Sequence, residues 1–320
     1  MADLEGGGSA RSAGLTGRTP AVRTREEIAE RLAAAGYVAD TDLASSLLLM
    51  EMLARPLLVE GAAGVGKTAI AYALADVHET RLIRLQCHEG LDQASALYEW
   101  NYQRQLLAIK AREGGGGTYR AEEIEDALFS ERYLLERPLL AAIREERRAI
   151  LLIDEIDRAD EEFEAFLLEL LADFQISIPE LGTIRARSIP RVVLTSNGTR
   201  ELSDALRRRC LYHYLDYPAI DREAAILRAR LPGLGIDLAA QVARLVAAIR
   251  KEQLRKVPGV AESLDWAAAL LGLGIGDLAS TAGSRAPEAL YETLVCVLKT
   301  HEDRAQIDRA TFSRLIAKVA

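Results

Sequence analysis

The sequence is poor in aromatic residues and in cysteine, and it contains no long apolar run. Phe, Trp and Tyr make up 5% of the 320 residues, so a core has to be built mainly from Leu, Ala, Ile and Val. Cys87, Cys210 and Cys296 lie far apart without a CxxC or histidine-spaced pattern, which excludes a disulfide framework and a recognisable zinc site. No stretch reaches the roughly 20 apolar residues that a membrane-spanning helix needs.

Basic residues are also fewer than acidic residues. The chain has 48 Asp and Glu against 40 Lys and Arg, a formal net charge of −8, and an acidic surface does not favour general binding of nucleic acid. Residues 1–23 are rich in Gly, Ser, Thr and Arg and lack the apolar segment of a secretory signal. These features predict a disordered N-terminal tail and a cytoplasmic protein without a membrane span.

The apolar pattern over residues 24–217 predicts an α/β core. Thr24 is a typical helix N-cap, with Glu27 three residues later and Gly36 at the end, and a second helix is expected over 43–54. Short apolar runs separated by helical patterns then predict a parallel five-stranded sheet that is covered on both faces. The expected strands are 56–60, 81–87, 149–154, 191–197 and 210–217.

One helix of this core is strongly amphipathic. In residues 160–175 the apolar side chains form one stripe, and Glu161, Glu164 and Asp173 are predicted to point away from it. The segment 174–187 that follows predicts a short hairpin.

Another insertion is expected over 90–120. It contains Tyr98, Trp100 and Tyr102, whose alternation predicts one face of a strand or hairpin, and a Gly-rich loop at 114–117. These aromatic side chains either contact a client protein or pack within the insertion. After Pro218 only helical patterns occur, among them 287–302, so residues 218–320 are expected to form a smaller all-α lid domain.

A phosphate-binding loop is indicated by Gly61-Ala62-Ala63-Gly64-Val65-Gly66-Lys67-Thr68, which matches GxxxxGK(S/T). An expected strand precedes it and an expected helix follows, whereas a chance Gly-rich turn would not need both flanks. Backbone N–H groups in such a loop surround the phosphates, Lys67 reaches the β- and γ-phosphates, and the Thr68 hydroxyl binds Mg²⁺. No Asn-Lys-x-Asp guanine motif is present, so ATP is favoured over GTP.

Acidic residues follow the apolar run 150–153. Asp154 is positioned to orient Mg²⁺ through water, and Glu155 to polarise an attacking water. Alternatively, both side chains cap the next helix. The P-loop upstream favours the catalytic interpretation and indicates a hydrolytic ATPase.

Two further polar positions complete this pattern. Asn197 ends the fourth strand, where an amide bonds the attacking water or the γ-phosphate, although a lone Asn is also a common turn residue. Arg207, Arg208 and Arg209 precede the fifth strand. They form either a solvated face or the source of an arginine that reaches the nucleotide of a neighbouring subunit, with Arg209 the first candidate and Arg208 the second.

These features in this order, followed by a helical lid, resemble the AAA+ ATPases over about residues 25–320. The segments 84–107, 151–183, 195–218 and 262–271 resemble the MoxR branch, and within it the CoxD-like accessory ATPases of carbon monoxide dehydrogenase. The resemblance implies an αβα core with ATP and Mg²⁺, a homo-oligomeric ring (usually a hexamer), and an insertion and a hairpin that face the pore or the client.

The resemblance also implies partners. MoxR ATPases act as chaperone-like remodellers that mature metalloenzymes beside a von Willebrand factor A domain protein, and CoxD-like members serve a molybdenum hydroxylase client. One departure concerns the lid arginine (sensor 2) that many AAA+ proteins use: residues 257–264 contain no arginine, so Lys256 or Arg255 substitutes or the lid contributes little to hydrolysis.

Other classes of function stay open at this point. A nucleic-acid motor is disfavoured by the acidic composition and by the lack of a recognisable DNA-binding module. A nucleotide-gated scaffold that binds ATP with little hydrolysis is compatible with the missing lid arginine.

Overall fold

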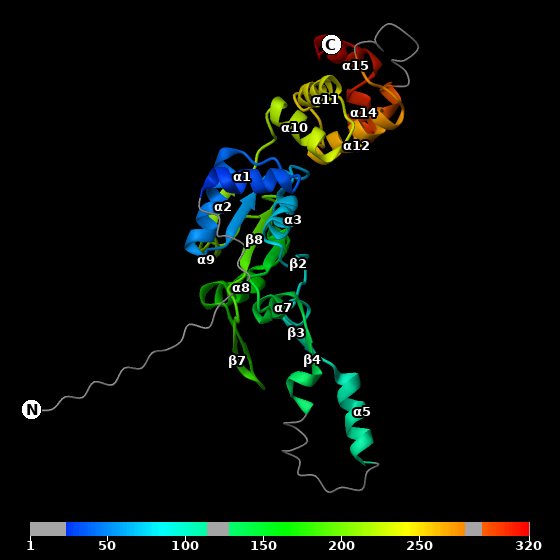
Figure 1. Cartoon of the computed structure of the whole chain (residues 1–320). Coiled ribbons are helices and arrows are strands. Elements are labelled where there is room, and N and C mark those ends of the chain that lie inside the picture. Colours follow the sequence, from blue (N-terminus) through cyan, green and yellow to red (C-terminus); the bar gives the residue numbers. More distant parts are fainter. Residues whose placement is uncertain (1–23, 114–127, 279–289, 320) are drawn as a thin grey trace, which may run out of the picture.

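The computed structural model describes residues 24–113, 128–278 and 290–319. The predicted tail 1–23 and the Gly-rich loop 114–117 lie outside these residues. Within them, a central sheet and a group of helices lie one above the other (Figure 1).

The central sheet has five parallel strands in the order β2-β5-β8-β1-β9, as the sequence predicts. The register places Glu60 beside Ser196 and Gln86 beside Asp154, so the carboxyl ends of the strands meet at one edge. The strands are β1 (Leu57–Glu60), β2 (Leu82–Gln86), β5 (Ile150–Asp154), β8 (Arg191–Ser196) and β9 (Leu211–Tyr214).

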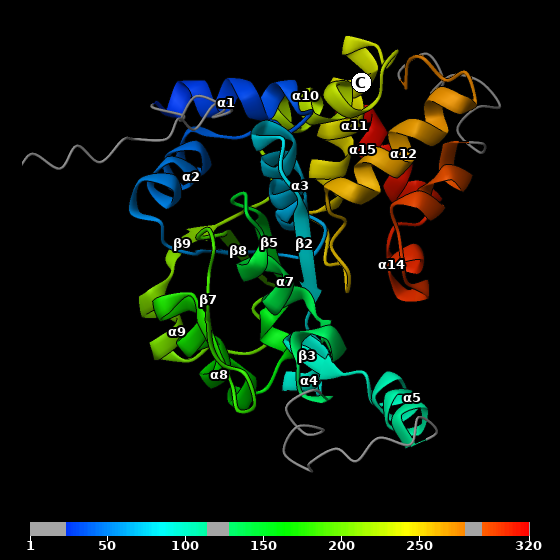
Figure 2. The same ribbon diagram turned by 60° about the horizontal axis from the view of Figure 1, so that its bottom comes forward.

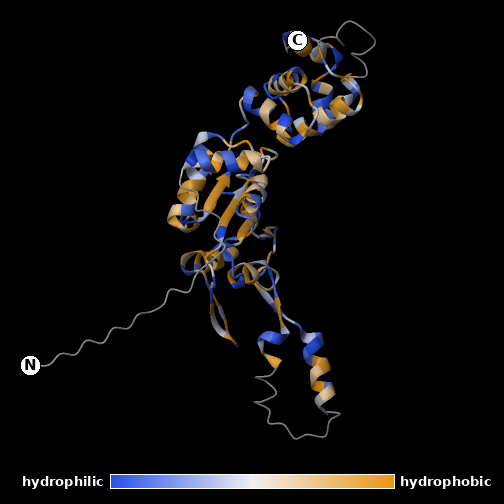
Figure 3. Ribbon diagram, in the orientation of Figure 1, coloured by the Kyte–Doolittle hydropathy of each residue, from blue (hydrophilic) through white to orange (hydrophobic). Residues whose placement is uncertain are grey.

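Helices cover both faces of this sheet (Figure 2). Every residue of β5 is buried, because one face packs against helices on one side and the other face against helices on the opposite side. Figure 3 shows the resulting apolar strands at the centre of the core. One layer contains α1 (Arg25–Ala34), α2 (Thr41–Leu53) and α3 (Lys67–His78); the other contains α7 (Pro138–Arg144), α8 (Glu161–Asp173) and α9 (Asp204–Arg209).

The first helices begin where the sequence predicts. The Thr24 hydroxyl accepts the backbone N–H of Glu27 at 3.1 Å, and α1 ends before Gly36, whose φ is 76°. In α8, however, the prediction for Glu164 is wrong. This side chain is buried because its carboxylate pairs with Arg200 and accepts the backbone N–H of Ser203 at 2.9 Å. Buried charges persist where they are paired in this way.

Two protrusions extend from the core, away from the helical group (Figure 1). The hairpin of β6 (Gln175–Ile178) and β7 (Gly182–Arg185) confirms the prediction for 174–187. In the insertion, β3 (Tyr98–Trp100) pairs with β4 (Leu134–Glu136), but Tyr102 begins a helix instead of continuing the strand. Further elements of the insertion are α4 (Gln93–Ala96), α5 (Tyr102–Glu113) and the 3-10 helix η1 (Glu131–Tyr133).

Beyond β9 the described residues contain helices only, packed around the fully buried Trp266. The helix expected over 287–302 is interrupted. The Thr293 hydroxyl bonds the Leu290 carbonyl at 2.6 Å and accepts the Trp266 indole N–H at 2.7 Å, and the chain turns there. The helices are α10 (Ile220–Arg230), α11 (Ile236–Ile249), α12 (Val260–Gly272), η4 (Thr293–Cys296), α14 (His301–Gln306) and α15 (Arg309–Val319).

Arg250 joins the parts of this helical region that lie nearest the core. Its guanidinium pairs with both oxygens of the fully buried Glu223 at 2.6 and 2.7 Å, bonds the Pro258 carbonyl at 2.8 Å and lies over the Tyr217 ring. Because α10, α11 and the segment before α12 share this one side chain, they are held in a defined arrangement next to the sheet. None of the helices within the described ranges has the length and apolar character to cross a membrane.

Candidate functional site

The P-loop residues Gly61–Thr68 connect β1 to α3 at the carboxyl edge of the sheet. Gly64 and Gly66 have φ values of 77° and 99°, which favour glycine. A Cβ on Gly61 would lie 2.1 Å from the Leu215 carbonyl oxygen, so a side chain does not fit there. Gly66 is the N-cap of α3 and has no side chain to cap it, so the first N–H groups of this helix can bind an anion.

Lys67 lies inside this loop and is buried. Its ammonium donates to the carbonyl oxygens of Gly61 and Ala62 at 2.7 Å each and to Oδ1 of Asn197 at 2.8 Å. Burial lowers the pKa of Lys67, and the nearby carboxylates of Asp157 and Asp154 oppose this shift. The sequence-predicted lysine and amide are therefore in direct contact, although they are far apart along the chain.

Asp154 is the buried carboxylate at the end of β5. Its Oδ1 accepts the hydroxyls of Thr68 at 3.0 Å and Thr195 at 2.6 Å. Its Oδ2 accepts two N–H groups of Arg84, from Nε at 3.0 Å and from Nη2 at 2.6 Å. The predicted pair Thr68 and Asp154 is thus brought together, with Thr195 and Arg84 added by the fold.

Glu155 follows in a left-handed backbone conformation with φ of 56°. Its N–H donates to Thr195 Oγ1 at 2.9 Å, and its carboxylate lies 3.5 Å from Arg158. A positive φ is unfavourable for a residue with a side chain, and the contact with Thr195 holds it in place. Glu155 therefore lines the cavity beside Asp154 instead of capping the next helix in a standard geometry.

Asp157 fixes the loop that contains Asn197. Its carboxylate accepts the N–H of Asn197 at 3.2 Å, and the N–H and hydroxyl of Thr199 at 3.0 and 2.6 Å. Burial raises the pKa of Asp157, but the hydrogen bonds from Thr199 and Asn197 outweigh it and lower the pKa overall. Asp157 stays ionised and holds the backbone of Asn197, whose side-chain amide contacts Lys67.

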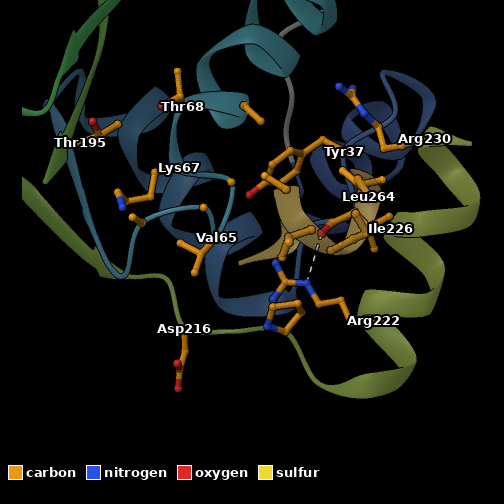
Figure 4. Close-up of a pocket in the computed structure, with 18 of the residues that line it drawn as sticks. Tyr37, Val65, Lys67, Thr68, Thr195, Asp216, Arg222, Ile226, Arg230 and Leu264 are labelled. Carbon is orange, nitrogen blue, oxygen red and sulfur yellow. Dashed lines mark hydrogen bonds between the residues drawn. The ribbon is translucent and has the colours of Figure 1, made fainter. Parts of the chain in front are cut away.

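A cavity of about 370 Å³ extends from the P-loop to the helical region. Figure 4 shows Lys67, Thr68 and Thr195 toward one end, and Tyr37, Ile226 and Leu264 toward the other. Arg222 closes this second end: it bonds the Val38 carbonyl at 3.3 Å and pairs with Asp40, which also caps α2. The cavity is polar where phosphates would lie and mainly apolar where a base would lie.

Arg208 and Arg209 lie elsewhere, at the end of α9, and neither lines this cavity. The guanidinium of Arg55 donates to both of their backbone carbonyl oxygens. Its Nη2 bonds the Arg208 carbonyl at 2.5 Å, and its Nε bonds the Arg209 carbonyl at 3.2 Å. Within one subunit the structure therefore does not bring the two predicted arginines to the P-loop.

Several residues of the site were missed by sequence reasoning, and some had a usable signal. Arg84 and Gln86 alternate with buried residues in β2, which marks a polar face on an edge strand. Arg222, Ile226 and Arg230 line the cavity at a helical spacing of four. Lys256 and Arg255 do not line it; Arg255 is exposed and pairs with Glu302.

The residues present fit Mg²⁺ bound together with a triphosphate. The Thr68 hydroxyl and the Asp154 carboxylate are hard oxygen ligands, 3.0 Å apart at the start of α3. Among the described residues no group of three or more His, Cys, Asp and Glu is arranged to hold an ion alone. A divalent ion at this place would therefore take further ligands from phosphate and water, as Mg²⁺ does in nucleotide sites.

Residues 56–210 match the model of the AAA domain, dynein-related subfamily, and this span includes every candidate residue from Gly61 to Arg209. The chain is also similar to two structures of RuvB from Thermotoga maritima. A proline-to-glycine mutant is 16% identical, with 90% of this chain and 72% of that chain covered and a TM-score of 0.43. The Holliday junction branch migration motor is 17% identical, with 79% and 66% covered and a TM-score of 0.39. No curated protein matches the chain.

Proposed function

We propose that this protein is a Mg²⁺-dependent ATPase of the AAA+ class that works as a homo-oligomeric ring. The observation that supports this best is the direct contact of Lys67 with Asn197 at 2.8 Å and of Thr68 with Asp154 at 3.0 Å. These contacts join the P-loop to the ends of β5 and β8, so the residues needed for phosphoryl transfer share one cavity. The AAA domain match over residues 56–210 is consistent with this assignment.

In this proposal the P-loop binds the triphosphate. The N–H groups at the start of α3 and the Lys67 ammonium stabilise phosphate oxygens, and Lys67 exchanges its bonds with the Gly61 and Ala62 carbonyls for them. Thr68 and Asp154 would hold Mg²⁺, and the ion would supply charge neutralisation at the triphosphate. Tyr37, Ile226 and Leu264 pack against the base.

Hydrolysis then depends on Glu155 and Asn197. Glu155 lines the cavity beside Asp154, where its carboxylate accepts a proton from the attacking water. Asn197, held by Asp157, orients that water or a γ-phosphate oxygen. The backbone N–H groups of both residues are held by buried partners, Thr195 for Glu155 and Asp157 for Asn197, which limits the movement of the backbone that carries them.

A ring would supply each cavity with an arginine from the neighbouring subunit. Because Arg208 and Arg209 do not line the cavity of their own chain, we propose that one of them stabilises the transition state in a neighbouring subunit. Residues 218–320 act as a lid, since α10 and α12 contribute Arg222, Ile226 and Leu264 to the base end of the cavity.

We further propose a MoxR-type role, in which ATP hydrolysis remodels or matures a metalloenzyme. The support is that the segments 84–107 and 151–183 resemble MoxR sequences. The first segment contains α4 and β3 of the insertion, and the second contains most of the β6-β7 hairpin. Both protrusions lie on the side of the core away from the helical region (Figure 1). The proposed partners are a von Willebrand factor A domain protein and a molybdenum hydroxylase client of the carbon monoxide dehydrogenase type.

The ATPase proposal is tested with wild-type protein and the variants Lys67→Ala, Glu155→Gln and Arg209→Ala, with assembly followed by light scattering. We expect Lys67→Ala to lose nucleotide binding. Glu155→Gln and Arg209→Ala should bind ATP but lose turnover, the latter by on the order of a thousandfold. Arg187→Ala, an exposed arginine on the loop after β7, is the matched control for charge. Wild-type turnover that Glu155→Gln leaves unchanged would refute the hydrolytic role.

The client proposal needs its own measurement. We expect the turnover rate to rise with the A-domain partner and the client together, and client maturation to fail in cells that contain only the Glu155→Gln variant. A rate that saturating amounts of both proteins do not change, with maturation independent of Glu155, would contradict it.

A nucleotide-gated scaffold is the second candidate. The observation that favours it is the start of α12, where residues 257–264 contact the P-loop without an arginine, so the lid supplies no cation from this helix. In a scaffold ATP would bind and change the lid position with negligible hydrolysis. A single-turnover assay with radiolabelled ATP distinguishes the two, because a scaffold releases intact ATP.

A further inference from the structure

Arg84 makes an ion pair with the carboxylate that we assign to Mg²⁺. Its Nε and Nη2 donate to Oδ2 of Asp154 at 3.0 and 2.6 Å. Asp154 is buried, with 3% of its side chain exposed, whereas the Arg84 side chain is 44% exposed. The guanidinium therefore reaches in from solvent to a buried carboxylate.

The strand register explains how Arg84 reaches this position. β2 is an edge strand and pairs with β5, so that Arg84 lies beside Leu152 and Gln86 beside Asp154. Successive side chains of a strand alternate between the faces, so Arg84 and Gln86 share the face of Asp154. The Gln86 amide oxygen accepts a further hydrogen bond from Arg84 and keeps the guanidinium at this edge.

Oδ1 of the same carboxylate is held independently of Arg84. It accepts the hydroxyls of Thr68 at 3.0 Å and Thr195 at 2.6 Å. Asp154 therefore keeps its orientation without the guanidinium, and the remaining effect of Arg84 is its positive charge. A guanidinium and a divalent cation on one carboxylate repel each other, and the repulsion is strong where the group is buried.

We propose that Arg84 competes with Mg²⁺ for Asp154. On binding of Mg²⁺ with the triphosphate, the Arg84 guanidinium would leave Oδ2 for the adjoining solvent, where the Gln86 amide oxygen would still accept a hydrogen bond from it. Arg84 thereby sets the Mg²⁺ concentration at which nucleotide binding reaches half of its maximum. This inference rests on the proposed nucleotide site, and it concerns the affinity for Mg²⁺ rather than the chemical step.

The test measures binding and not turnover. A fluorescent, non-hydrolysable ATP analogue is titrated into the protein at a series of Mg²⁺ concentrations, and the midpoint of the Mg²⁺ dependence is recorded. We expect Arg84→Gln and Arg84→Ala to lower this midpoint by about tenfold, because a neighbouring cation is removed while Thr68 and Thr195 stay in place. Arg84→Lys retains the positive charge and should keep the midpoint within about twofold of wild type.

Arg81→Gln is the matched control. Arg81 directly precedes β2, pairs with Glu145 at 2.6 Å and is 65% exposed, so its removal changes net charge equally without touching Asp154. We expect its midpoint to equal that of wild type. Circular dichroism of each variant verifies that the fold is retained.

The outcomes separate this inference from the proposed function. If wild-type protein binds no nucleotide and Lys67→Ala is indistinguishable from it, the nucleotide site itself is wrong. If wild type binds in a Mg²⁺-dependent way that Lys67→Ala abolishes, the site stands. In that case an unchanged midpoint in Arg84→Gln and Arg84→Ala contradicts the proposal that Arg84 competes with Mg²⁺, and leaves the nucleotide site standing. A raised midpoint also contradicts it, and shows that Arg84 orients Asp154 for the metal.

Discussion

The backbone N–H of Val260 donates to the carbonyl oxygen of Gly64 at 2.8 Å. This bond joins the first turn of α12 to the middle of the phosphate-binding loop. Gly259 precedes it, and a Cβ at this position would lie 2.7 Å from the Gly64 carbonyl oxygen. The helical region therefore contacts the P-loop through backbone atoms, and a change in the loop on nucleotide binding would be transmitted directly to α12.

We expect Gly259→Ala to separate α12 from the P-loop and to weaken nucleotide binding. The added methyl group meets backbone atoms that cannot move independently, so the whole helix has to shift, at a cost of about 1–3 kcal/mol. The measurement is nucleotide affinity by fluorescence, together with the lid position by small-angle scattering. Gly272→Ala, at the other end of α12 with open space around it, is the control and should leave both unchanged.

Arg55 should act on turnover through α9. Because its guanidinium holds the carbonyls of Arg208 and Arg209, Arg55→Ala frees the end of α9 and misplaces the arginines proposed to reach a neighbouring subunit. We expect turnover to fall at least tenfold with nucleotide affinity unchanged. In a double variant with Arg209→Ala the two losses should not add, and additive losses would show that Arg55 acts elsewhere.

Glu51 predicts a pH dependence of stability. Burial alone would raise its pKa, but hydrogen bonds from His78 and Arg191 outweigh burial and lower the pKa to about 2. The unfolded chain binds the proton near 4.5, so the stabilisation is complete above that pH and is lost as the pH falls toward 2. Denaturant unfolding of wild type and Glu51→Gln should differ by about 3 kcal/mol at neutral pH, and the difference should shrink over this range.

The Glu223–Arg250 pair should stabilise the helical region. Glu223 is fully buried, so Arg250→Leu leaves an unpaired carboxylate, at a cost of about 3–5 kcal/mol. Trp266 fluorescence in a Trp100→Phe background reports unfolding of this region. Glu302→Gln removes the exposed partner of Arg255 and is the control, with an expected change below about 1 kcal/mol. Equal effects of the two variants would contradict the role of the buried pair.

Much of the site follows from local patterns. The strand 56–60, the glycines and the start of α3 lie next to one another in sequence, and together they define the P-loop without knowledge of distant residues. Asp154 is also evident, because a carboxylate after a fully apolar strand lies at the carboxyl edge of a parallel sheet. Glu164 shows the opposite case: its helical position looks solvent-facing until Arg200 and Ser203 approach from another segment.

By itself the sequence determined the parallel strands, the helices between them, the N-cap at Thr24 and the phosphate-binding loop, because these depend on periodicity and on neighbours a few residues away. Only the tertiary structure decided that Arg84 pairs with Asp154, that Arg55 holds the end of α9 and that Arg222 closes the cavity. Each of these contacts joins residues far apart in the chain. Strand order and helix packing bring them together, and the residues near any one of them in sequence do not encode it.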